Sequence, residues 1–199
     1  MATAEPVMAI AVRHVILDRD GVLNVESSAG GYVRDWSQWR WMPGALDGLR
    51  LLRAAGIRVS VATNQAGVGH GLVDRADLDA IHTHMLAEAA QAGGMIDRVF
   101  VCPHAPNSGC DCRKPAPGLL VHAIEASRIP RQATVSIGDA MRDMEAAWAA
   151  DLSPVLVRTG KGRLTEAALA GRAVPVFDDL REFAASVVPN SIPRVSDHP

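Results

Sequence analysis

The sequence predicts an α/β fold with three layers, in which a parallel sheet carries helices on both faces. Short apolar runs rich in β-branched residues alternate along the chain with longer amphipathic stretches, the order that right-handed β-α-β crossovers produce. The apolar runs are continuous rather than interrupted by polar residues, as expected for strands that are covered on both faces. The 199 residues, 48% hydrophobic and 21% charged, are enough for one good core.

The expected strands and helices follow one another along the chain. We expect strands at residues 14–18, 58–62, 98–102, 134–138 and 154–158, and a weaker strand at 173–177. Helices are expected at residues 45–55, 75–92, 118–127, 141–150, 166–170 and 178–187. We expect one domain over residues 1–188, followed by a loose C-terminal tail at 189–199.

Bulk properties argue against two classes of partner. A formal net charge of -2 provides no general attraction to nucleic acid or to a membrane surface. No apolar run approaches the roughly 20 residues that span a bilayer. The N-terminal residues carry the acidic Glu5 rather than a basic start and are expected to form a short tail, not a signal peptide. We therefore expect neither a nucleic-acid nor a membrane partner. We also expect a monomer.

Two carboxylates follow the first expected strand. Asp18 and Asp20 come directly after the apolar run at residues 15–17. Side chains alternate along a strand, so both carboxylates face the same side, and Gly21 lets the chain turn immediately afterwards. Carboxylates crowded at a strand end repel each other unless a cation lies between them, and oxygen ligands favour Mg²⁺. An ordinary Asp-x-Asp-Gly surface turn is the alternative that this pattern alone leaves open.

The next three strands also end in reactive side chains. Thr63 follows the second strand and precedes a glycine-rich segment, Lys114 follows the third, and Asp139 follows the fourth. A hydroxyl and a run of backbone amides suit phosphate oxygens, and a third carboxylate can complete a metal site. Asp143 lies one helical turn beyond Asp139 and is expected to orient ligands or the Lys114 ammonium. Ligands of open α/β sheets bind beyond the carboxyl ends of the strands, so these side chains should converge there.

This ordered set resembles the haloacid dehalogenase superfamily of phosphohydrolases over nearly the whole chain. The motifs that carry the resemblance are Asp18-x-Asp20-Gly21-Val22, Thr63, Lys114 and Gly138-Asp139-x-x-x-Asp143. The resemblance implies a Rossmann-like fold and a Mg²⁺-dependent phosphomonoesterase that acts through an aspartyl-phosphate.

The resemblance also implies a role for each motif residue. Asp18 would be the nucleophile, and Asp20 would be the general acid that then serves as the base. The backbone carbonyl of Asp20, together with Asp18 and Asp139, would hold Mg²⁺. Thr63 and Lys114 would bind the transferring phosphoryl group. Phosphoryl transfer depends mainly on positioning and charge neutralisation, which these groups can provide.

Three cysteines and a histidine form a second cluster. Cys102 and His104 are followed, after a loop with proline and glycine, by Cys110 and Cys112. Two close pairs of such ligands suit one tetrahedral Zn²⁺ with no open coordination position, hence a structural site. Three buried thiols beside an unrelated histidine are the alternative. An odd number of closely spaced cysteines argues against a disulfide framework and favours a reducing, cytoplasmic setting.

The zinc motif, followed directly by Arg113-Lys114-Pro115, resembles the branch that holds heptose bisphosphate phosphatases and histidinol-phosphate phosphatases. Gly31-Tyr32-Val33 and the glycine segment 67–71 resemble the heptose side more closely. The implied substrate is D-glycero-D-manno-heptose 1,7-bisphosphate, with histidinol phosphate or another small sugar phosphate as the alternative. The residues expected to contact it are Arg19, Ser27, Ser28, Gly31, Tyr32, Asn64, Gln65, Ala66 and Arg113.

The segment 24–43 is long for a connection and carries Trp36, Trp39 and Trp41. We expect a packed flap rather than a ligand cage, because tryptophan buries a large apolar area wherever it lies. The stretch between Asp20 and Thr63 is too short for a flap, a helix and also a large separate lid. We therefore expect a capless protein whose flap and zinc loop shape the substrate site.

Two other classes of protein are compatible with parts of this pattern. A receiver-like phosphoacceptor also uses Asp, Mg²⁺, Thr and Lys at strand ends. Its acidic pair and its phosphorylated Asp lie on different strands, whereas Asp20 here is placed to hydrolyse the intermediate. A zinc-ribbon nucleic-acid binder would need a basic stripe, which the sequence lacks.

Overall fold

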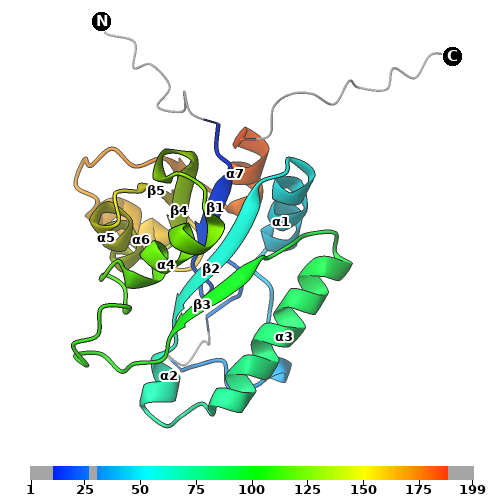
Figure 1. Cartoon of the computed structure of the whole chain (residues 1–199), viewed down its shortest axis with the longest axis vertical. Helices are drawn as coiled ribbons and strands as arrows, with labels where there is room; N and C mark the ends of the chain where they lie inside the picture. The colour runs from blue at the N-terminus through cyan, green and yellow to red at the C-terminus, as the bar shows by residue number, and fades with distance from the viewer. Residues whose placement is uncertain (1–10, 27–30, 188–199) are drawn as a thin grey trace, which may run out of the picture.

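The protein is described by a computed structural model for residues 11–26 and 31–187. Its strands form one parallel sheet in the order β3-β2-β1-β4-β5-β6 (Figure 1). The strands are β1 (His14–Leu17), β2 (Arg58–Asn64), β3 (Arg98–Cys102), β4 (Thr134–Gly138), β5 (Ser153–Val157) and β6 (Val176–Phe177). β1 lies near the centre and pairs with β2 and β4. The predicted parallel α/β architecture is confirmed.

Helices cover both faces of this sheet. On one face lie α1 (Ala45–Ala54), α3 (Arg75–Gln91) and α7 (Leu180–Val187). The other face carries α4 (Gly118–Ser127), α5 (Met141–Ala149) and α6 (Gly162–Ala168). Between β2 and α3 lies the short helix α2 (Ala66–Gly69), and two 3-10 turns occur at η1 (Trp36–Gln38) and η2 (Arg131–Ala133).

The packing of β1 shows why its residues 15–17 are all apolar. Val15 and Leu17 point into the core shared with α1, α3 and α7, whereas Ile16 points into the core shared with α4 and α5. All three side chains are almost completely buried. Burying a side chain of this size contributes roughly 1.5–3 kcal/mol, so the alternating side chains stabilise both layers.

Several element boundaries differ from the prediction. β2 continues to Asn64 rather than ending at residue 62. Helix α6 begins at Gly162 rather than at residue 166, directly after a turn whose Lys161 amide donates to Asp139 Oδ2 at 2.8 Å. A turn fixed by a partner so distant in the sequence leaves no local pattern of apolar residues to read. The predicted tail, 189–199, lies outside the described residues and stays a prediction.

The glycine-rich segment after Thr63 is helix α2 rather than the open loop that the sequence indicates. A Cβ on Gly67 would lie 2.8 Å from Tyr32 Cγ, and a Cβ on Gly69 would lie 2.5 Å from the backbone nitrogen of Ala105. The flap and the loop after β3 therefore both pack directly on the α2 backbone. These two glycines are needed for close packing.

The tryptophans form the packed flap that the sequence predicts. The Trp36 and Trp39 rings stack with centroids 5.2 Å apart, and Trp41 meets Trp39 edge-on at 5.2 Å. Trp36 also stacks on His84 of α3, and Trp41 Nε1 donates to Glu88 Oε2 at 2.7 Å. The flap is thus anchored on α3.

Between β1 and α1, the described residues contain η1 and isolated bridges but no further domain, in agreement with a capless fold. In the part of the chain that the structure describes, none of the helices combines the length and the apolar character that crossing a membrane requires.

Candidate active site

The predicted strand-end residues converge at one edge of the sheet. Asp18 directly follows β1, Thr63 lies near the end of β2, and Asp139 directly follows β4. The Asp18 amide donates to the Ile137 carbonyl at 2.9 Å, which continues the β1–β4 pairing up to the carboxylate. Carboxylate oxygens of Asp18, Asp139 and Asp143 lie within 4.8 Å of one another. Parallel pairing therefore brings together side chains that are more than a hundred residues apart.

Lys114 lies inside this group of carboxylates. Its Nζ is 2.9 Å from Asp18 Oδ1 and 2.7 Å from Asp143 Oδ1, and it donates to the Ala62 carbonyl at 2.8 Å. The ammonium thus has one close acceptor for each of its three N–H donors. Burial alone would lower the pKa of Lys114, but Asp143 and Asp18 outweigh it and raise the pKa. Lys114 is therefore a cation, and Asp143 orients it as the sequence predicts.

The backbone of Lys114 is held by Asn64. The Asn64 side chain donates to the Lys114 carbonyl at 2.9 Å and accepts from the Lys114 amide at 3.1 Å. Two hydrogen bonds to one peptide unit fix where the lysine side chain starts. Asn64, predicted to contact substrate, therefore also positions Lys114.

Asp139 has the features expected of a metal ligand. Its Oδ2 accepts from the Lys161 amide, whereas its buried Oδ1 has no hydrogen-bond partner among the described residues. Gly21 and Gly160 both pack closely against this carboxylate. A Cβ on either glycine would lie 2.1 Å from Oδ2. A buried, unpartnered carboxylate oxygen is costly unless a cation occupies the space beside it. Asp18 and Asp139 thus fit a small cation with oxygen ligands, such as Mg²⁺.

The electrostatics of the two carboxylates agree with their geometry. Burial raises the pKa of Asp18 to about 6, with Lys114 opposing that rise. Burial, together with the charge of Asp18, raises the pKa of Asp139 to about 7. Both groups are crowded anions that a divalent cation would stabilise in the ionised form.

Asp20 lies in a different environment. Its Oδ1 accepts from Arg19 Nη2 and Asn24 Nδ2, both at 2.9 Å, and its Oδ2 accepts from Gln65 Nε2 at 2.8 Å. Burial alone would raise the pKa of Asp20, but Arg19, helped by Asn24 and Gln65, lowers it. Gln65 Nε2 also lies 2.7 Å from Thr63 Oγ1, which links Asp20 to the end of β2.

Arg19 is buried and supports this network from behind. Its Nη1 lies 3.2 Å from His82 Nε2, and its guanidinium lies over the Trp39 ring at 5.8 Å. Burial, and then the charge of Arg19, lowers the pKa of His82 to about 4. His82 is therefore neutral at pH 7 and accepts through Nε2. The sequence around His82 gives no sign of this contact, because only the packing of α3 brings the side chain to Arg19.

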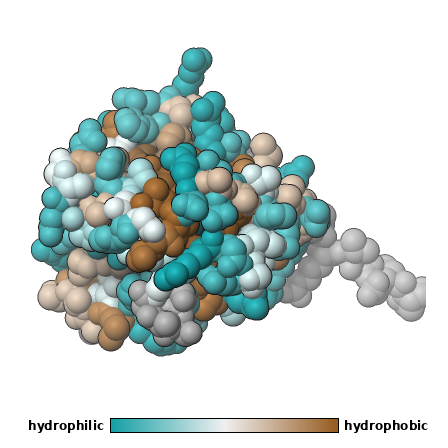
Figure 2. Space-filling view, turned by 90° about the horizontal axis from the view of Figure 1, so that it is seen from below, coloured by the Kyte–Doolittle hydropathy of each residue, from teal (hydrophilic) through white to brown (hydrophobic). Residues whose placement is uncertain are grey.

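A cavity of about 190 Å³ opens beside Asp20. Its lining contains Arg19, Gly31, Tyr32, Asn64, Gln65, Ala66 and Arg113 of the predicted substrate contacts. The remaining two, Ser27 and Ser28, lie outside the described residues. The strands of Figure 1 run toward this side, which Figure 2 shows from below as a mostly hydrophilic surface around a hydrophobic strip.

Five other residues, not predicted from the sequence, line the cavity or hold its groups. Glu26, Val33, Arg142 and Lys161 line it, and Asn24 holds Asp20. Lys161 follows β5. It could have been predicted, because ligands of open α/β sheets bind beyond the carboxyl ends of the strands. Arg142 lies inside the Asp139-x-x-x-Asp143 motif, and its position in the first turn of α5 was the available signal.

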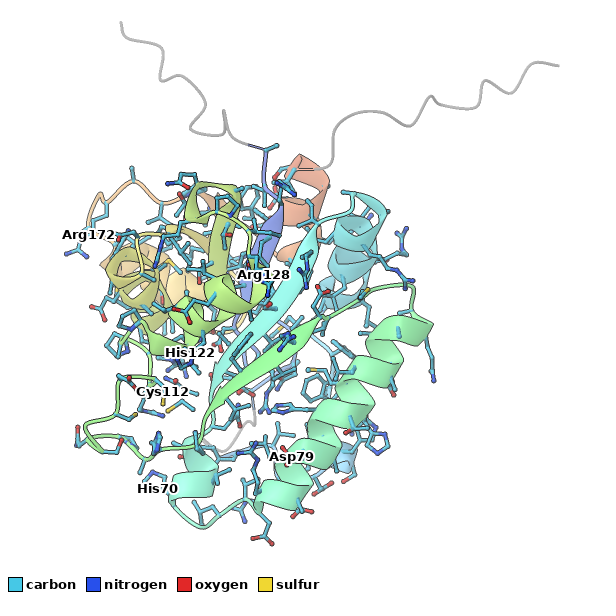
Figure 3. All side chains as sticks on the ribbon, viewed as in Figure 1. His70, Asp79, Cys112, His122, Arg128 and Arg172 are labelled. Atoms are coloured by element: carbon cyan, nitrogen blue, oxygen red, sulfur yellow. The ribbon has the colours of Figure 1, made fainter. Side chains whose placement is uncertain are left out.

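The second cluster is assembled at the end of β3. Cys102 Sγ is 3.8 Å from Cys110 Sγ and 3.5 Å from His104 Nδ1, and His104 Nδ1 is 3.3 Å from Cys112 Sγ. Zinc–sulfur bonds of about 2.3 Å at tetrahedral angles give sulfur–sulfur distances of about 3.8 Å. A disulfide would need about 2.05 Å. The donor set and its spacing fit Zn²⁺ with four protein ligands. Figure 3 shows Cys112 on the same side of the molecule as His70, which follows α2.

Comparisons with known proteins agree with these features. Residues 111–183 match the HAD-hydrolase-like family model. The D-glycero-β-D-manno-heptose-1,7-bisphosphate 7-phosphatase of Pseudomonas putida is 41% identical over 174 residues, covering 87% of this chain and 98% of that protein. The corresponding α-anomer phosphatase of Mycobacterium tuberculosis is 38% identical and is covered to 90%, with 87% of this chain aligned.

A solved structure extends the likeness to three dimensions. D,D-heptose 1,7-bisphosphate phosphatase from B. bronchiseptica, complexed with magnesium and phosphate, matches with a TM-score of 0.83 and 40% identity. The match covers 88% of this chain and 98% of that one. Identity at this level over almost the full length of the relatives confirms the resemblance seen in the motifs. The chain therefore belongs to the family of HAD-like hydrolases that includes the D-glycero-D-manno-heptose-1,7-bisphosphate 7-phosphatases.

Proposed function

We propose that this protein is a Mg²⁺-dependent phosphomonoesterase that removes the 7-phosphate of D-glycero-D-manno-heptose 1,7-bisphosphate through an aspartyl-phosphate. One observation carries the proposal. The buried carboxylate of Asp18 lies 2.9 Å from Lys114 Nζ, at the strand edge where one Asp139 oxygen has no partner within residues 11–26 and 31–187. The neighbouring cavity is lined by both cationic and acidic side chains.

In the first step, an Asp18 carboxylate oxygen attacks phosphorus while the bond from phosphorus to the sugar oxygen breaks. Lys114 and Thr63 neutralise and position the phosphoryl oxygens. Asp143 keeps the ammonium in place, since its Oδ1 lies 2.7 Å from Nζ. A carboxylate is an adequate nucleophile here because its surroundings reduce the repulsion between the two anions.

Asp20 handles the protons of both steps. It donates a proton to the leaving sugar oxygen and later takes one from the water that attacks the aspartyl-phosphate, which releases phosphate and restores Asp18. The hydrogen bonds from Arg19, Asn24 and Gln65 favour the carboxylate form needed in the second step. An anionic phosphoryl group bound beside Asp20 favours the protonated form needed in the first.

Asp18, Asp139 and the Asp20 backbone carbonyl are the groups that would hold Mg²⁺. When bound there, the ion supplies positive charge for the transferring phosphoryl group. Cys102, His104, Cys110 and Cys112 would hold a structural Zn²⁺ that orders the loop before Lys114. We assign no chemistry to this second metal, because the four ligands complete its coordination.

The choice of sugar rests on the relatives and on the shape of the site. The Pseudomonas and Mycobacterium proteins are named for opposite anomers of the same heptose bisphosphate. Gly31 and Tyr32 of the flap and Arg113 of the zinc loop lie on the cavity wall, where they can contact the sugar.

A phosphate-release panel tests the proposal. Both anomers of the heptose bisphosphate, histidinol phosphate and common sugar monophosphates are assayed with Mg²⁺ and the Zn²⁺-loaded protein. We expect the highest kcat/KM for a heptose bisphosphate anomer and a value at least about tenfold lower for histidinol phosphate, because missing polar contacts cost at least this much. The reverse ranking, or equal rates on simple monophosphates, would overturn the heptose assignment.

A further inference from the structure

The cations of the cavity differ in how far they are already engaged. Lys161 Nζ pairs with Glu26 Oε1 at 2.8 Å, and Arg113 Nη1 donates to the His104 carbonyl at 3.2 Å. Arg19, the third, is held by Asp20 and His82 as described above. Each of these side chains therefore has a protein partner before any ligand enters.

Arg142 is the exception among the described cavity residues. Within the described ranges, its shortest contact with an anion is 4.0 Å, from Nη2 to Asp18 Oδ2, which is beyond hydrogen-bond distance. Its Nε is buried and has no hydrogen-bond partner in the described part of the chain. Burial alone would lower the pKa of Arg142, but Asp18, Asp143 and Asp139 raise it, so the side chain is charged. A charged guanidinium with unused donors faces the cavity.

Arg142 and Lys114 lie near different oxygens of Asp18 and differ in their exposure to solvent. Lys114 is 3% exposed and contacts Oδ1, whereas Arg142 is 34% exposed and lies nearer Oδ2 while lining the cavity. Arg142 is the second residue of α5, so its side chain starts at the positive end of that helix. Lys114 suits the buried phosphoryl group beside Asp18, and Arg142 suits an anion in the cavity.

A sugar bisphosphate brings a second anion of about -1.5 to -2 charge. If the transferring phosphoryl group lies on Asp18, Thr63 and Lys114, the other phosphate lies farther out in the cavity. The planar guanidinium of an arginine binds phosphate with two parallel hydrogen bonds. Arg142 has the charge, the unused donors and the partial exposure that this second phosphate requires.

We propose that Arg142 binds the phosphate group that is not transferred and thereby makes this enzyme select a bisphosphate over the matching monophosphate. The proposal rests on the function proposed above, because it presupposes a substrate with two phosphates. It assigns Arg142 to binding and leaves phosphoryl transfer to the residues at the strand ends.

The test compares two substrates that share the transferred phosphate, heptose 1,7-bisphosphate and heptose 7-phosphate. Arg142→Gln removes the charge and keeps a hydrogen-bonding side chain. Arg142→Lys keeps the charge and removes the planar guanidinium that can donate two parallel hydrogen bonds. The matched control is Arg172→Gln, because Arg172 packs on Trp148 and lies away from Cys112 and His70 in Figure 3. Melting temperatures of all variants verify that they are folded.

We expect Arg142→Gln to lower kcat/KM for the bisphosphate at least about tenfold, mainly through KM, because a charge-assisted contact shared by ground and transition states is lost. The value for the 7-phosphate should change less than about twofold, and Arg142→Lys should fall between wild type and Arg142→Gln. Equal losses on both substrates, with a lower kcat, would mean that Arg142 acts on the transferring group and would overturn the proposal. No loss on either would also overturn it.

The activity of the wild-type protein on the two heptose phosphates shows whether the role of Arg142 or the proposed function itself has failed. If wild type selects the heptose bisphosphate and Arg142→Gln keeps that selectivity, the function stands and Arg142 is excluded as its cause. If wild type cleaves neither heptose compound, the function fails. Arg142 is then tested with fructose 1,6-bisphosphate and fructose 6-phosphate as inhibitors of p-nitrophenyl phosphate hydrolysis. An inhibition constant that Arg142→Gln raises at least about tenfold for the bisphosphate alone supports the binding role, and equal constants overturn it.

Discussion

The carboxylate cluster and the thiol cluster of this protein are assembled in opposite ways. Asp18, Lys114 and Asp139 come from distant parts of the chain and meet because parallel strands end at one edge of the sheet. The four zinc-type ligands all fall within residues 102–112, and of these only Cys102 belongs to a strand. The first cluster depends on the complete fold, whereas the second depends mainly on the spacing of a single loop.

The clusters also differ in burial and charge. Asp18 and Asp139 are buried, with their charge partly offset by Lys114, whereas the side chains of Cys110 and Cys112 are only half-buried. A conservative substitution in the first cluster should therefore reduce catalytic activity more than it reduces stability. A single-atom change in the second should alter stability and metal content first.

The sharpest test of this contrast is Asp18→Asn. The substitution keeps the size of the side chain and removes the attacking charge, so kcat should fall at least about a thousandfold. The melting temperature should change little, because Lys114 keeps its ion pair with Asp143. Phosphate release and thermal unfolding are the measurements. Asp77→Asn on the exposed face of α3 is the matched control, and substantial activity in Asp18→Asn would disprove the aspartyl-phosphate mechanism.

Cys110→Ser should show the opposite balance. Purified wild type should contain about one Zn²⁺ per chain, and the variant should lose it together with stability. We expect a melting temperature lower by roughly 5–10 °C, since about 1 kcal/mol corresponds to roughly 2–4 °C in a protein of this size.

Elemental analysis and thermal unfolding measure both effects, and Asp111→Asn, at an exposed position of the same loop, serves as the control. A zinc-free wild type with full activity and an unchanged melting temperature after Mg²⁺ addition would refute a structural zinc site.

The pH dependence of stability should isolate the carboxylate cluster. The pKa values of Asp18 and Asp139 are raised to about 6 and about 7 in the folded protein. The folded state therefore holds more protons than the unfolded state above their ordinary pKa, and stability of the Mg²⁺-free protein should fall as pH rises toward 7. Mg²⁺ binds the ionised carboxylates, so it should restore stability at pH 8 and have little effect at pH 5.

The restored stability is about 2.7 kcal/mol when free Mg²⁺ is about 100 times its Kd. Thermal unfolding of Zn²⁺-loaded protein, with and without Mg²⁺, measures it across this pH range. Asp139→Asn should lose most of the response, and a Mg²⁺ effect of equal size at pH 5 would contradict the assignment.

The smallest expected effect concerns the support behind Asp20. His82→Leu removes the acceptor for Arg19 Nη1 and leaves a buried donor unpaired, which costs about 1–3 kcal/mol. Activity should fall less than about tenfold, and the acidic limb of its pH profile should shift because Arg19 no longer holds Asp20 in place. His82→Gln should recover part of both, and the exposed His122→Gln should change neither. An unchanged pH profile in His82→Leu would limit His82 to a packing role.

Much of this molecule could be predicted because its strands are short apolar runs with polar side chains directly after them. That pattern led to Asp18, Thr63, Lys114 and Asp139, and the thiol spacing led to the second cluster. The contacts of Asn24 and His82 could not be predicted, since they depend on how the flap and α3 pack around Arg19. The start of α6 was missed for the same reason, because Asp139 of another segment holds the turn before it.

The in-register pairing of β1 with β4 limits how the chain length can vary. Leu17 lies opposite Ile137, and one residue inserted into β1 would turn Asp18 to the opposite face of the sheet. The loop between His104 and Cys110 has no such constraint, because side-chain contacts hold its ends, His104 to Cys112 and Cys110 to Cys102, and not a ladder of backbone hydrogen bonds. Among homologues, insertions and deletions are therefore expected in that loop, whereas the strand before Asp18 should keep a constant length.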